Sequence, residues 1–356
     1  MLWPDTISKK FNIRYPVIQA PMFGVSTPQM VSATARAGCL GSLALADLSA
    51  DQSADLIRQT KKLTDQPFAV NIFVHHIPEI TESLKAGYIR TKLFIEQLAE
   101  ENNINVHLPG LEDIKINGYH EQIDVINDEN CKIVSFTFGN LDDESIRKLK
   151  ENEVTLIGTC TSVEEALILE NSGIDMICVQ GIEAGGHRGT FNAEDILRIG
   201  GLSLLAQVDD RVNVPLIYAG GIYNAQTLKA SKELGAQGFQ VGSMLLASEE
   251  SALQPFEKER LQNVNAKDIV LTRSFSGRYA RGIKNKYIQA LESSEYILPY
   301  PYQNKLTNEL RKVSKALKNT DFVSIWAGQS IHRYSELSTE DILKKLIREC
   351  EETDKF

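Results

Sequence analysis

PLIYAGGIYNAQTLKASKELGAQGFQVGS, residues 215–243, contains two apolar runs that both end at glycine. The runs PLIYAGG and GFQVGS are separated by a segment with helical periodicity. A buried apolar strand followed by a glycine turn and a helix is typical of a parallel sheet covered by helices on both faces. The stretch therefore predicts two successive strand–helix units, and the same pattern recurs along the rest of the chain.

Eight apolar or β-branched runs are candidate strands. Two segments between them begin with helix-start signals, Ser26 or Thr27 before Pro28 in one and Thr161 or Ser162 in the other. Eight strand–helix units in the first 245 residues match the ~250 residues of a (β/α)8 barrel. The candidate strands are residues 17–22, 39–46, 68–74, 133–139, 154–160, 176–181, 215–221 and 238–243.

A doubly wound open sheet is the alternative fold. Such a sheet carries the phosphate-binding pattern G-x-G-x-x-G after its first strand. Here the first candidate strand runs into QAPMFGVSTP, residues 19–28, which lacks that pattern. We therefore predict an α/β protein with a (β/α)8 TIM barrel.

Two segments exceed what a barrel needs, and they predict the domain organisation. We expect residues 1–74 and 131–245 to form the barrel. Residues 75–130 form a helical insertion after strand 3, over the barrel mouth, because an insertion that leaves the end of a barrel strand is placed to roof the site there. Residues 246–356 form a mostly helical C-terminal extension, a smaller lid domain that contributes to the substrate pocket.

Composition excludes several classes of function. The 356 residues carry a net charge of -9 without a basic block, which argues against a nucleic-acid partner. Residues 1–22 contain neither a signal-peptide pattern nor a membrane span, so we expect a cytoplasmic protein. The five scattered cysteines are expected to be buried reduced thiols, and His75 and His76 to be loop residues rather than metal ligands, so we expect no metal.

Glycines after the last two candidate strands predict a phosphate site. Gly220 and Gly221 follow one strand, and Gly242 and Ser243 follow the next. In barrels these two loops commonly hold a phosphate, since glycine lets backbone N–H groups approach an anion. A tight strand–helix turn with no ligand is the alternative interpretation.

Three polar side chains are expected at the same end of the barrel. Asn71 and Gln180 lie in apolar strands, where a buried amide needs a partner such as a flat heteroaromatic ring or the neighbouring backbone. His187 lies in the glycine-rich loop QGIEAGGHRG, residues 180–189, and is suited to take a proton or to bind an anion. Arg188 beside it is expected to be solvated or paired with a carboxylate.

Motifs along nearly the whole chain resemble the class I nitronate monooxygenases, formerly called 2-nitropropane dioxygenases. EAGGHRG within QGIEAGGHRGTF is the most specific of them. The motifs are QAPM (19–22), STP (26–28), AGCLG (37–41), NIFV (71–74), SFTFG (135–139), GTCTSVEEA (158–166), QGIEAGGHRGTF (180–191), AGGI (219–222), QVGS (240–243), FSGRYARGIKN (275–285) and WAGQS (326–330).

The resemblance implies an FMN-dependent barrel enzyme that oxidises alkyl nitronates with O2 to a carbonyl product and nitrite. Propionate 3-nitronate, a toxic metabolite, is the implied substrate, so the reaction is a detoxification. His187 matches the active-site histidine of the family. The residues that would bind FMN are Pro21, Met22, Asn71, Gln180, Gly185, Gly186, Gly220, Gly221, Gln240, Val241, Gly242 and Ser243.

Two positions depart from the family pattern. Cys39 replaces a glycine in AGGLG, and Thr137 replaces the histidine of SFHFG, which is expected to alter how the substrate fits. Tyr300, Tyr302 and Lys305, in LPYPYQNKLT, either reach the substrate pocket or belong to a packed tail.

Three alternatives remain open at this point. An NADH-dependent FMN reductase, of the enoyl-acyl-carrier-protein reductase or quinone reductase type, would be reduced by NADH. A non-redox isomerase or aldolase barrel would be colourless, and a flavin-binding scaffold would be yellow but inert. We expect a small-molecule nitronate and O2 as partners, no membrane, and a monomer or homodimer.

Overall fold

The computed structural model describes residues 1–292, 294–330 and 334–352. Eight parallel strands form one sheet in the order β1-β9-β8-β6-β5-β4-β3-β2, and a bridge between Ile18 and Leu40 joins β1 to the start of β2. The predicted TIM barrel is confirmed. Its strands are β1 (Val17–Gln19), β2 (Gly41–Ala46), β3 (Phe68–Phe73), β4 (Ile133–Thr137), β5 (Thr155–Cys160), β6 (Met176–Gln180), β8 (Leu216–Ala219) and β9 (Gly238–Val241).

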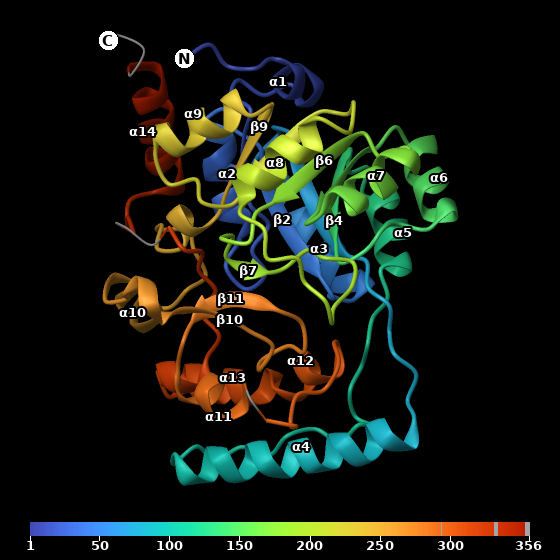
Figure 1. Cartoon of the computed structure of the whole chain (residues 1–356), viewed down its shortest axis with the longest axis vertical. Coiled ribbons are helices and arrows are strands. Elements are labelled where there is room, and N and C mark those ends of the chain that lie inside the picture. Colours follow the sequence, from blue (N-terminus) through green and yellow to red (C-terminus); the bar gives the residue numbers. More distant parts are fainter. Residues whose placement is uncertain (293, 331–333, 353–356) are drawn as a thin grey trace.

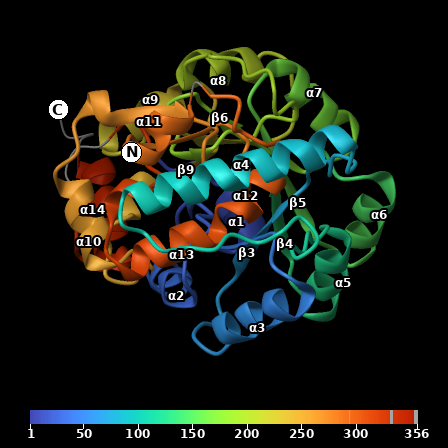
Figure 2. The same ribbon diagram turned by 90° about the horizontal axis from the view of Figure 1, so that it is seen from below.

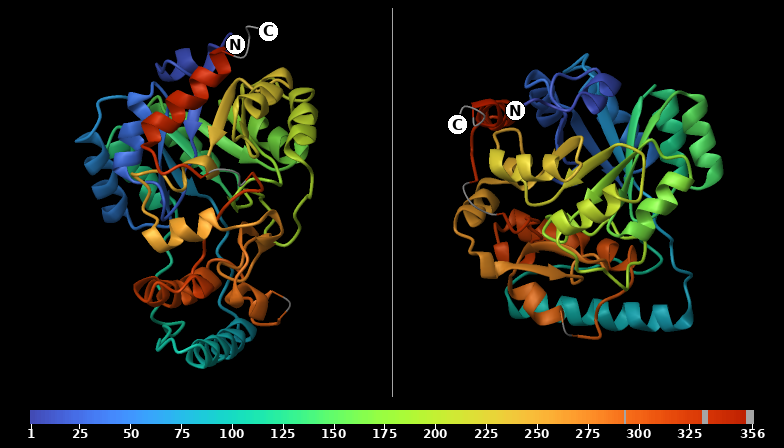
Figure 3. Two further views of the ribbon diagram at one scale, coloured as in Figure 1. Left: turned by 90° about the vertical axis from the view of Figure 1, so that its left-hand side faces the viewer. Right: turned by 45° about the horizontal axis from the view of Figure 1, so that its top comes forward.

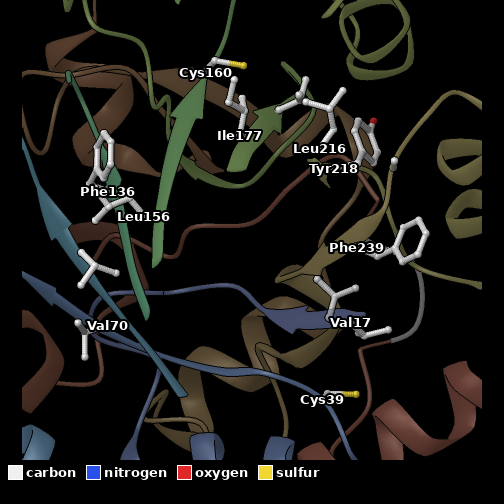
Figure 4. Packing of buried hydrophobic residues seen from close by; sticks show 14 of the residues in the cluster. Val17, Cys39, Val70, Phe136, Leu156, Cys160, Ile177, Leu216, Tyr218 and Phe239 are labelled. Atoms are coloured by element: carbon white, nitrogen blue, oxygen red, sulfur yellow. The ribbon is translucent and has the colours of Figure 1, made fainter. Parts of the chain in front are cut away.

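Neighbouring residues of each strand enter different cores, because successive side chains point to opposite faces of a sheet. Leu156 and Leu216 pack outward into the cluster between strands and helices, shown in Figure 4. Ile157 and Ile217, one position further along, belong to the cluster inside the barrel. Both faces are therefore apolar, which explains why these strands appear in the sequence as unbroken hydrophobic runs.

The helices α2, α3, α5, α6, α7, α8, α9 and α14 surround the barrel (Figure 2). Thr27 caps α2 by accepting from the N–H of Met30, and Ser162 caps α7 by accepting from that of Glu165. The predicted helix starts are thus correct. The bounds are α2 (Pro28–Arg36), α3 (Ala50–Lys61), α5 (His120–Asp128), α6 (Asp143–Glu151), α7 (Val163–Asn171), α8 (Gly201–Asp209), α9 (Ala225–Glu233) and α14 (Thr339–Glu352).

The C-terminal ends of the strands face a smaller lid, drawn below the barrel in Figure 1. Its three-stranded antiparallel sheet has the order β10-β11-β7, and β7 belongs to the loop after β6. Its elements are β7 (Gly186–His187), α10 (Pro255–Gln262), η2 (Ala266–Asp268), β10 (Ile269–Thr272), β11 (Ala280–Ile283), α11 (Lys286–Leu291), α12 (Tyr302–Leu306), α13 (Asn308–Ala316) and η3 (Thr320–Phe322), while η1 (Ser243–Leu245) follows β9 in the barrel.

The long helix α4 (Glu82–Glu101) lies across the lid, on the side away from the barrel (Figure 1). Tyr88 and Ile95 of α4 share one apolar cluster with Tyr287 and Leu310 of the lid. The insertion after β3 therefore covers the lid, while its last part, α5, packs between α3 and α6 in the barrel ring. The domain bounds at 75–130 and 246–356 stay a prediction.

The chain returns to the barrel at its C-terminal end. Helix α14 packs against α2 and α9, so it occupies the place of the helix after the eighth strand. The short α1 (Thr6–Phe11) inserts Ile7 and Phe11 into the cluster inside the barrel, at the end opposite the lid. The N-terminus lies beside α14 there (Figure 3), and its ammonium donates to the Cys350 carbonyl at 3.1 Å.

The cysteines are buried and unbonded, as expected. Burial raises the pKa of the Cys39 thiol to about 12 and that of Cys131 to about 11, so both stay protonated at neutral pH. In the described part of the chain, no helix combines the length and the hydropathy that a membrane crossing requires.

Candidate active site

A cavity of about 660 Å³ lies where the strand ends meet the lid. Barrel enzymes place their active sites at this end, and the volume suits a cofactor with a small substrate. No residue of 75–130 lines it, so the predicted roof comes instead from residues 300–330. The predicted site residues that line it are Pro21, Met22, Asn71, Thr137, Gln180, Gly185, Gly186, His187, Gly220, Gly221, Gln240, Gly242, Ser243 and Tyr300.

Glycines form one end of the cavity. Gly220 and Gly221 have φ values of 127° and 67°, which strain any residue with a side chain. No hydrogen bond between described residues uses the backbone N–H of Gly221 or of Ile222. Gly242, from the next strand end, lines the same space. This end of the cavity therefore offers backbone donors that an anion can approach closely.

The WAGQS loop, residues 326–330, closes over these glycines. The Gly328 N–H donates to the Ser243 hydroxyl at 2.8 Å, and the Ser330 hydroxyl donates to the Gly221 carbonyl at 3.2 Å. An added Cβ on Gly185 would lie 2.5 Å from the Gly328 nitrogen. Glycine at position 185 thus allows the loop that carries His187 to pack directly against the lid.

His187 is fixed by the lid sheet. It pairs with Ala280 in the β7–β11 ladder, and its Nε2 lies 2.8 Å from the Ser276 hydroxyl. That hydroxyl donates its proton to the Arg278 carbonyl at 3.1 Å. A hydroxyl has only one proton to donate, so Nε2 carries the imidazole proton and Nδ1 keeps the lone pair.

The surroundings of His187 keep it neutral. The rings of Phe138 and Trp326 lie 5.6 Å and 5.5 Å from its imidazole, measured between centroids. Burial, followed by the positive charges of Arg278 and Arg311, lowers the pKa of His187 to about 3. The ring therefore carries no charge at neutral pH, although the potential around it is positive.

The Gln180 amide holds the loop that contains His187. Its Nε2 donates to the His187 carbonyl at 3.0 Å, and its Oε1 accepts from Arg188 and from the Gly189 N–H, each at 2.9 Å. Asn71 donates to the Ser135 hydroxyl at 2.9 Å. Both amides face the cavity: Gln180 bonds backbone groups of the loop, whereas Asn71 bonds the Ser135 side chain.

Arg188 was expected to be solvated or paired with an acid, and this was wrong. Its side chain is 1% exposed. The guanidinium donates to the Gly181 carbonyl at 2.5 Å and to the Gln180 carbonyl at 3.2 Å. It therefore fixes the end of β6 from inside, a role that neighbouring residues in the sequence do not reveal.

Glu165 anchors the far end of the same loop. One carboxylate oxygen accepts from the Thr161 N–H at 2.6 Å and from its hydroxyl at 2.9 Å. The other accepts from the Phe191 N–H at 2.7 Å and from the Thr190 hydroxyl at 3.0 Å. This buried carboxylate connects the β5–α7 turn to the segment that follows His187.

Three predicted site residues do not line the cavity. Val241 is buried in the barrel, where its carbonyl accepts from the Ala20 N–H at 2.8 Å. The Tyr302 hydroxyl donates to the Pro78 carbonyl at 2.5 Å, and the Lys305 ammonium lies 2.6 Å from the Asp47 carboxylate, which lines the cavity. Tyr302 and Lys305 therefore lie behind the residues that line the cavity.

The two remaining substrate candidates do face the cavity. The Tyr300 hydroxyl is buried, and the described residues give it no hydrogen-bond partner. Thr137 lies against the loop, since a Cβ on Gly189 would come within 2.7 Å of its hydroxyl oxygen. Tyr300 thus has a polar atom left for a ligand.

Sequence reasoning assigned no role to Ser276, Arg278, Arg311, Asp47 or Trp326. The motifs FSGRYARGIKN and WAGQS contain three of them and were the available signal. The remaining two, Asp47 and Arg311, had no such signal.

Comparisons with known proteins agree on one family. The nitronate monooxygenase family model matches residues 5–349. A probable nitronate monooxygenase of Bacillus subtilis is 39% identical over 345 residues, which cover 96% of this chain and 97% of the relative. One from Staphylococcus saprophyticus is 36% identical over 352 residues, 96% of each chain.

Solved structures give the same result. Nitroalkane oxidase from Streptomyces ansochromogenes has a TM-score of 0.87 at 33% identity, covering 98% of both chains. FabK from Thermotoga maritima has a TM-score of 0.75 at 24% identity, covering 98% of this chain and 96% of that one, and it shares the fold. The chain therefore belongs to the nitronate monooxygenase family of oxidoreductases.

Proposed function

We propose that this protein oxidises alkyl nitronates with O2, using bound FMN, to a carbonyl product and nitrite. Propionate 3-nitronate is the proposed substrate. The observation that carries the proposal is one cavity that has glycine backbone donors at one end and a neutral, enclosed histidine in its wall. This arrangement suits a phosphate-bearing cofactor beside an anionic substrate.

The residues in the cavity fit FMN. Gly220, Gly221, Gly242 and Ser243 would hold its phosphate, because glycine lets backbone N–H groups approach an anion closely. A Cβ on Gly242 would lie 3.3 Å from that of Ala20. The residues that would lie along the remainder of the cofactor are Pro21, Met22, Asn71, Gln180, Gly185, Gly186 and Gln240, with Val241 behind them. Bound FMN would accept electrons from the nitronate and pass them to oxygen.

The chain itself supplies orientation and a dry, positive surrounding. The apolar rings of Phe138 and Trp326 pack beside His187, while Arg278 and Arg311 raise the potential there. A positive potential in a water-poor site favours an anion such as a nitronate. Binding such an anion would also raise the low pKa of His187.

The low pKa of His187 favours nitronates over neutral nitroalkanes. A ring whose pKa is about 3 has a free lone pair at neutral pH but is a weak base. A nitroalkane must first lose a proton from carbon, whereas a nitronate has already lost it. We therefore propose that His187 positions the nitro group of a bound nitronate after the anion has raised its pKa and Nδ1 has gained a proton, and that neutral Nδ1 removes a proton only when a nitroalkane is offered.

Substitution of His187 tests this assignment. We expect His187→Asn to lower kcat/KM for the nitronate by about 100-fold, within the range for a lost acid–base or anion-binding group. FMN should stay bound, which the visible absorbance of the purified variant measures. Unchanged nitronate kinetics would remove His187 from the reaction.

The decisive experiment is an anaerobic absorbance titration of the purified protein. One cuvette receives propionate 3-nitronate and the other NADH. We expect the oxidised-flavin bands to disappear with the nitronate and not with NADH. Admission of air should then restore the bands and release nitrite. Loss with NADH alone would make the protein a reductase, and a colourless preparation would exclude both functions.

A further inference from the structure

Helix α13 and the segment before it form one wall of the cavity. Tyr300, Asn304, Asn308 and Arg311 all line it, and the last three follow helical spacing. This wall faces the barrel loops from the lid side (Figure 1). A ligand in the cavity would therefore lie between α13 and the loop that carries His187.

Arg311 brings a positive charge into this wall without an acidic partner. Its Nη2 donates to the Asn304 carbonyl at 2.8 Å and to the Asn304 side-chain oxygen at 2.9 Å, and its Nε donates to the Thr307 carbonyl at 3.3 Å. All three acceptors are uncharged. In the described ranges, no carboxylate lies within ion-pair distance of Arg311.

The neighbouring charges are already compensated. Lys315 lies 3.2 Å from a Glu257 oxygen, and Lys312 lies 3.5 Å from Glu309. Asp47 interacts electrostatically with Arg311, but its carboxylate pairs with Lys305 at 2.6 Å. Among the described cationic side chains that line the cavity, Arg311 is therefore the one without a carboxylate partner.

Arg311 and His187 act on the same part of the cavity. The positive charge of Arg311 is one of the causes that lower the pKa of His187, so the two groups lie within electrostatic reach. Tyr300, whose hydroxyl has no partner among the described residues, is also within reach of Arg311. Because His187, Tyr300 and Arg311 all line this one cavity, a ligand that fills it lies between the His187 loop and the wall that carries Arg311.

We propose that Arg311 is a specificity-determining residue, which binds a carboxylate that the substrate carries at the end opposite its nitronate group. This inference rests on the proposed function. The bonds that Nη2 and Nε donate to Asn304 and Thr307 hold the guanidinium in place, and Nη1, which donates no hydrogen bond to a described residue, is left to bind a carboxylate. The residue therefore selects nitronates that bear a second negative charge.

Two nitronates with the same number of carbons provide the kinetic test. Propionate 3-nitronate carries the carboxylate, and propyl-1-nitronate has a methyl group in its place. Both nitronates lose the positive potential of Arg311 in Arg311→Met, but only propionate 3-nitronate also loses a charged hydrogen bond. We therefore expect the variant to lower kcat/KM for propionate 3-nitronate by about 10- to 100-fold more than for propyl-1-nitronate. Arg311→Lys keeps the charge but loses the bonds to Asn304 and Thr307 that hold the donor in place, so its kcat/KM for propionate 3-nitronate should fall between those of wild type and Arg311→Met.

Lys318→Met is the matched control. It removes one positive charge near the end of the same helix, but its side chain is exposed and does not line the cavity. We expect both nitronates to react as with wild type. If Arg311→Met lowers kcat/KM for the two nitronates equally, or leaves the value for propionate 3-nitronate unchanged, the proposal is overturned.

A binding measurement separates this proposal from the proposed function. Succinate, a close mimic of propionate 3-nitronate, and butyrate, which lacks the second carboxylate, are titrated into the flavin-loaded protein by calorimetry. We expect wild type to bind succinate at least 10-fold more tightly than butyrate, and Arg311→Lys to reduce that preference. Equal binding of the two by wild type overturns the proposal, even if every nitronate is oxidised. If wild type prefers succinate but oxidises no nitronate, the carboxylate site at Arg311 is supported and the proposed function is rejected.

Discussion

The buried carboxylate of Glu165 provides a sharp test of how the His187 loop is held. Its two oxygens each accept one backbone N–H, from Thr161 at 2.6 Å and from Phe191 at 2.7 Å. Glu165→Gln keeps only one oxygen, so the new NH2 group must face one of these donors. Glu164 is the matched control, because the same change is made at an exposed neighbour on the same helix.

The expected magnitude follows from these contacts. A buried N–H left without an acceptor costs about 1–3 kcal/mol, and loss of the charge weakens the remaining bonds. We therefore expect Glu165→Gln to lower the free energy of unfolding by about 2–4 kcal/mol. With an unfolding entropy of about 0.75 kcal/mol/K for 356 residues, this lowers Tm by about 3–5 °C.

Differential scanning calorimetry of the two variants is the assay. Glu164→Gln should lower Tm by less than about 1 °C, since it changes only an exposed charge near a helix start. The reasoning would be refuted if the two variants melted within 1 °C of each other. It would also be refuted if Glu165→Gln kept the full nitronate kcat/KM, because the loop it anchors carries His187.

Two further predictions concern the same loop. Gly185→Ala should lose FMN on purification, because its Cβ would lie 2.5 Å from the Gly328 nitrogen. Gly186→Ala is the control: its Cβ faces open space, and its φ of 74° lowers the free energy of unfolding by only about 1–2 kcal/mol. Equal flavin content of the two purified variants, measured by absorbance, would contradict this prediction. The second concerns pH. Because the folded protein lowers the pKa of His187 to about 3, the unfolded chain takes up that proton first as pH falls below about 6.5. The His187 contribution to the free energy of unfolding should therefore decrease from about pH 6.5 to about pH 3, and urea midpoints of His187→Asn should depend less on pH than those of wild type; parallel pH curves would reject the assignment.

Part of this protein could be predicted from the sequence alone, because the signals are local. A strand buried on both faces needs a continuous apolar run, and a tight turn with positive φ needs glycine, so β8 with Gly220 and Gly221 is visible within a few residues. The same holds for the caps of α2 and α7. The order of these signals along the chain then predicted the (β/α)8 fold and placed the candidate site at the C-terminal ends of the strands.

Only the tertiary structure decided which side chains share the cavity. His187 meets Ser276 across 89 residues of sequence, through a two-strand ladder too short to predict from a pattern. Arg188 and Arg311 look like ordinary charged residues in the sequence. One became a buried support for Gln180 and the other a charge without a counter-ion in the cavity wall. Burial and partners depend on how the lid packs on the barrel, so spacing along the chain could not predict them.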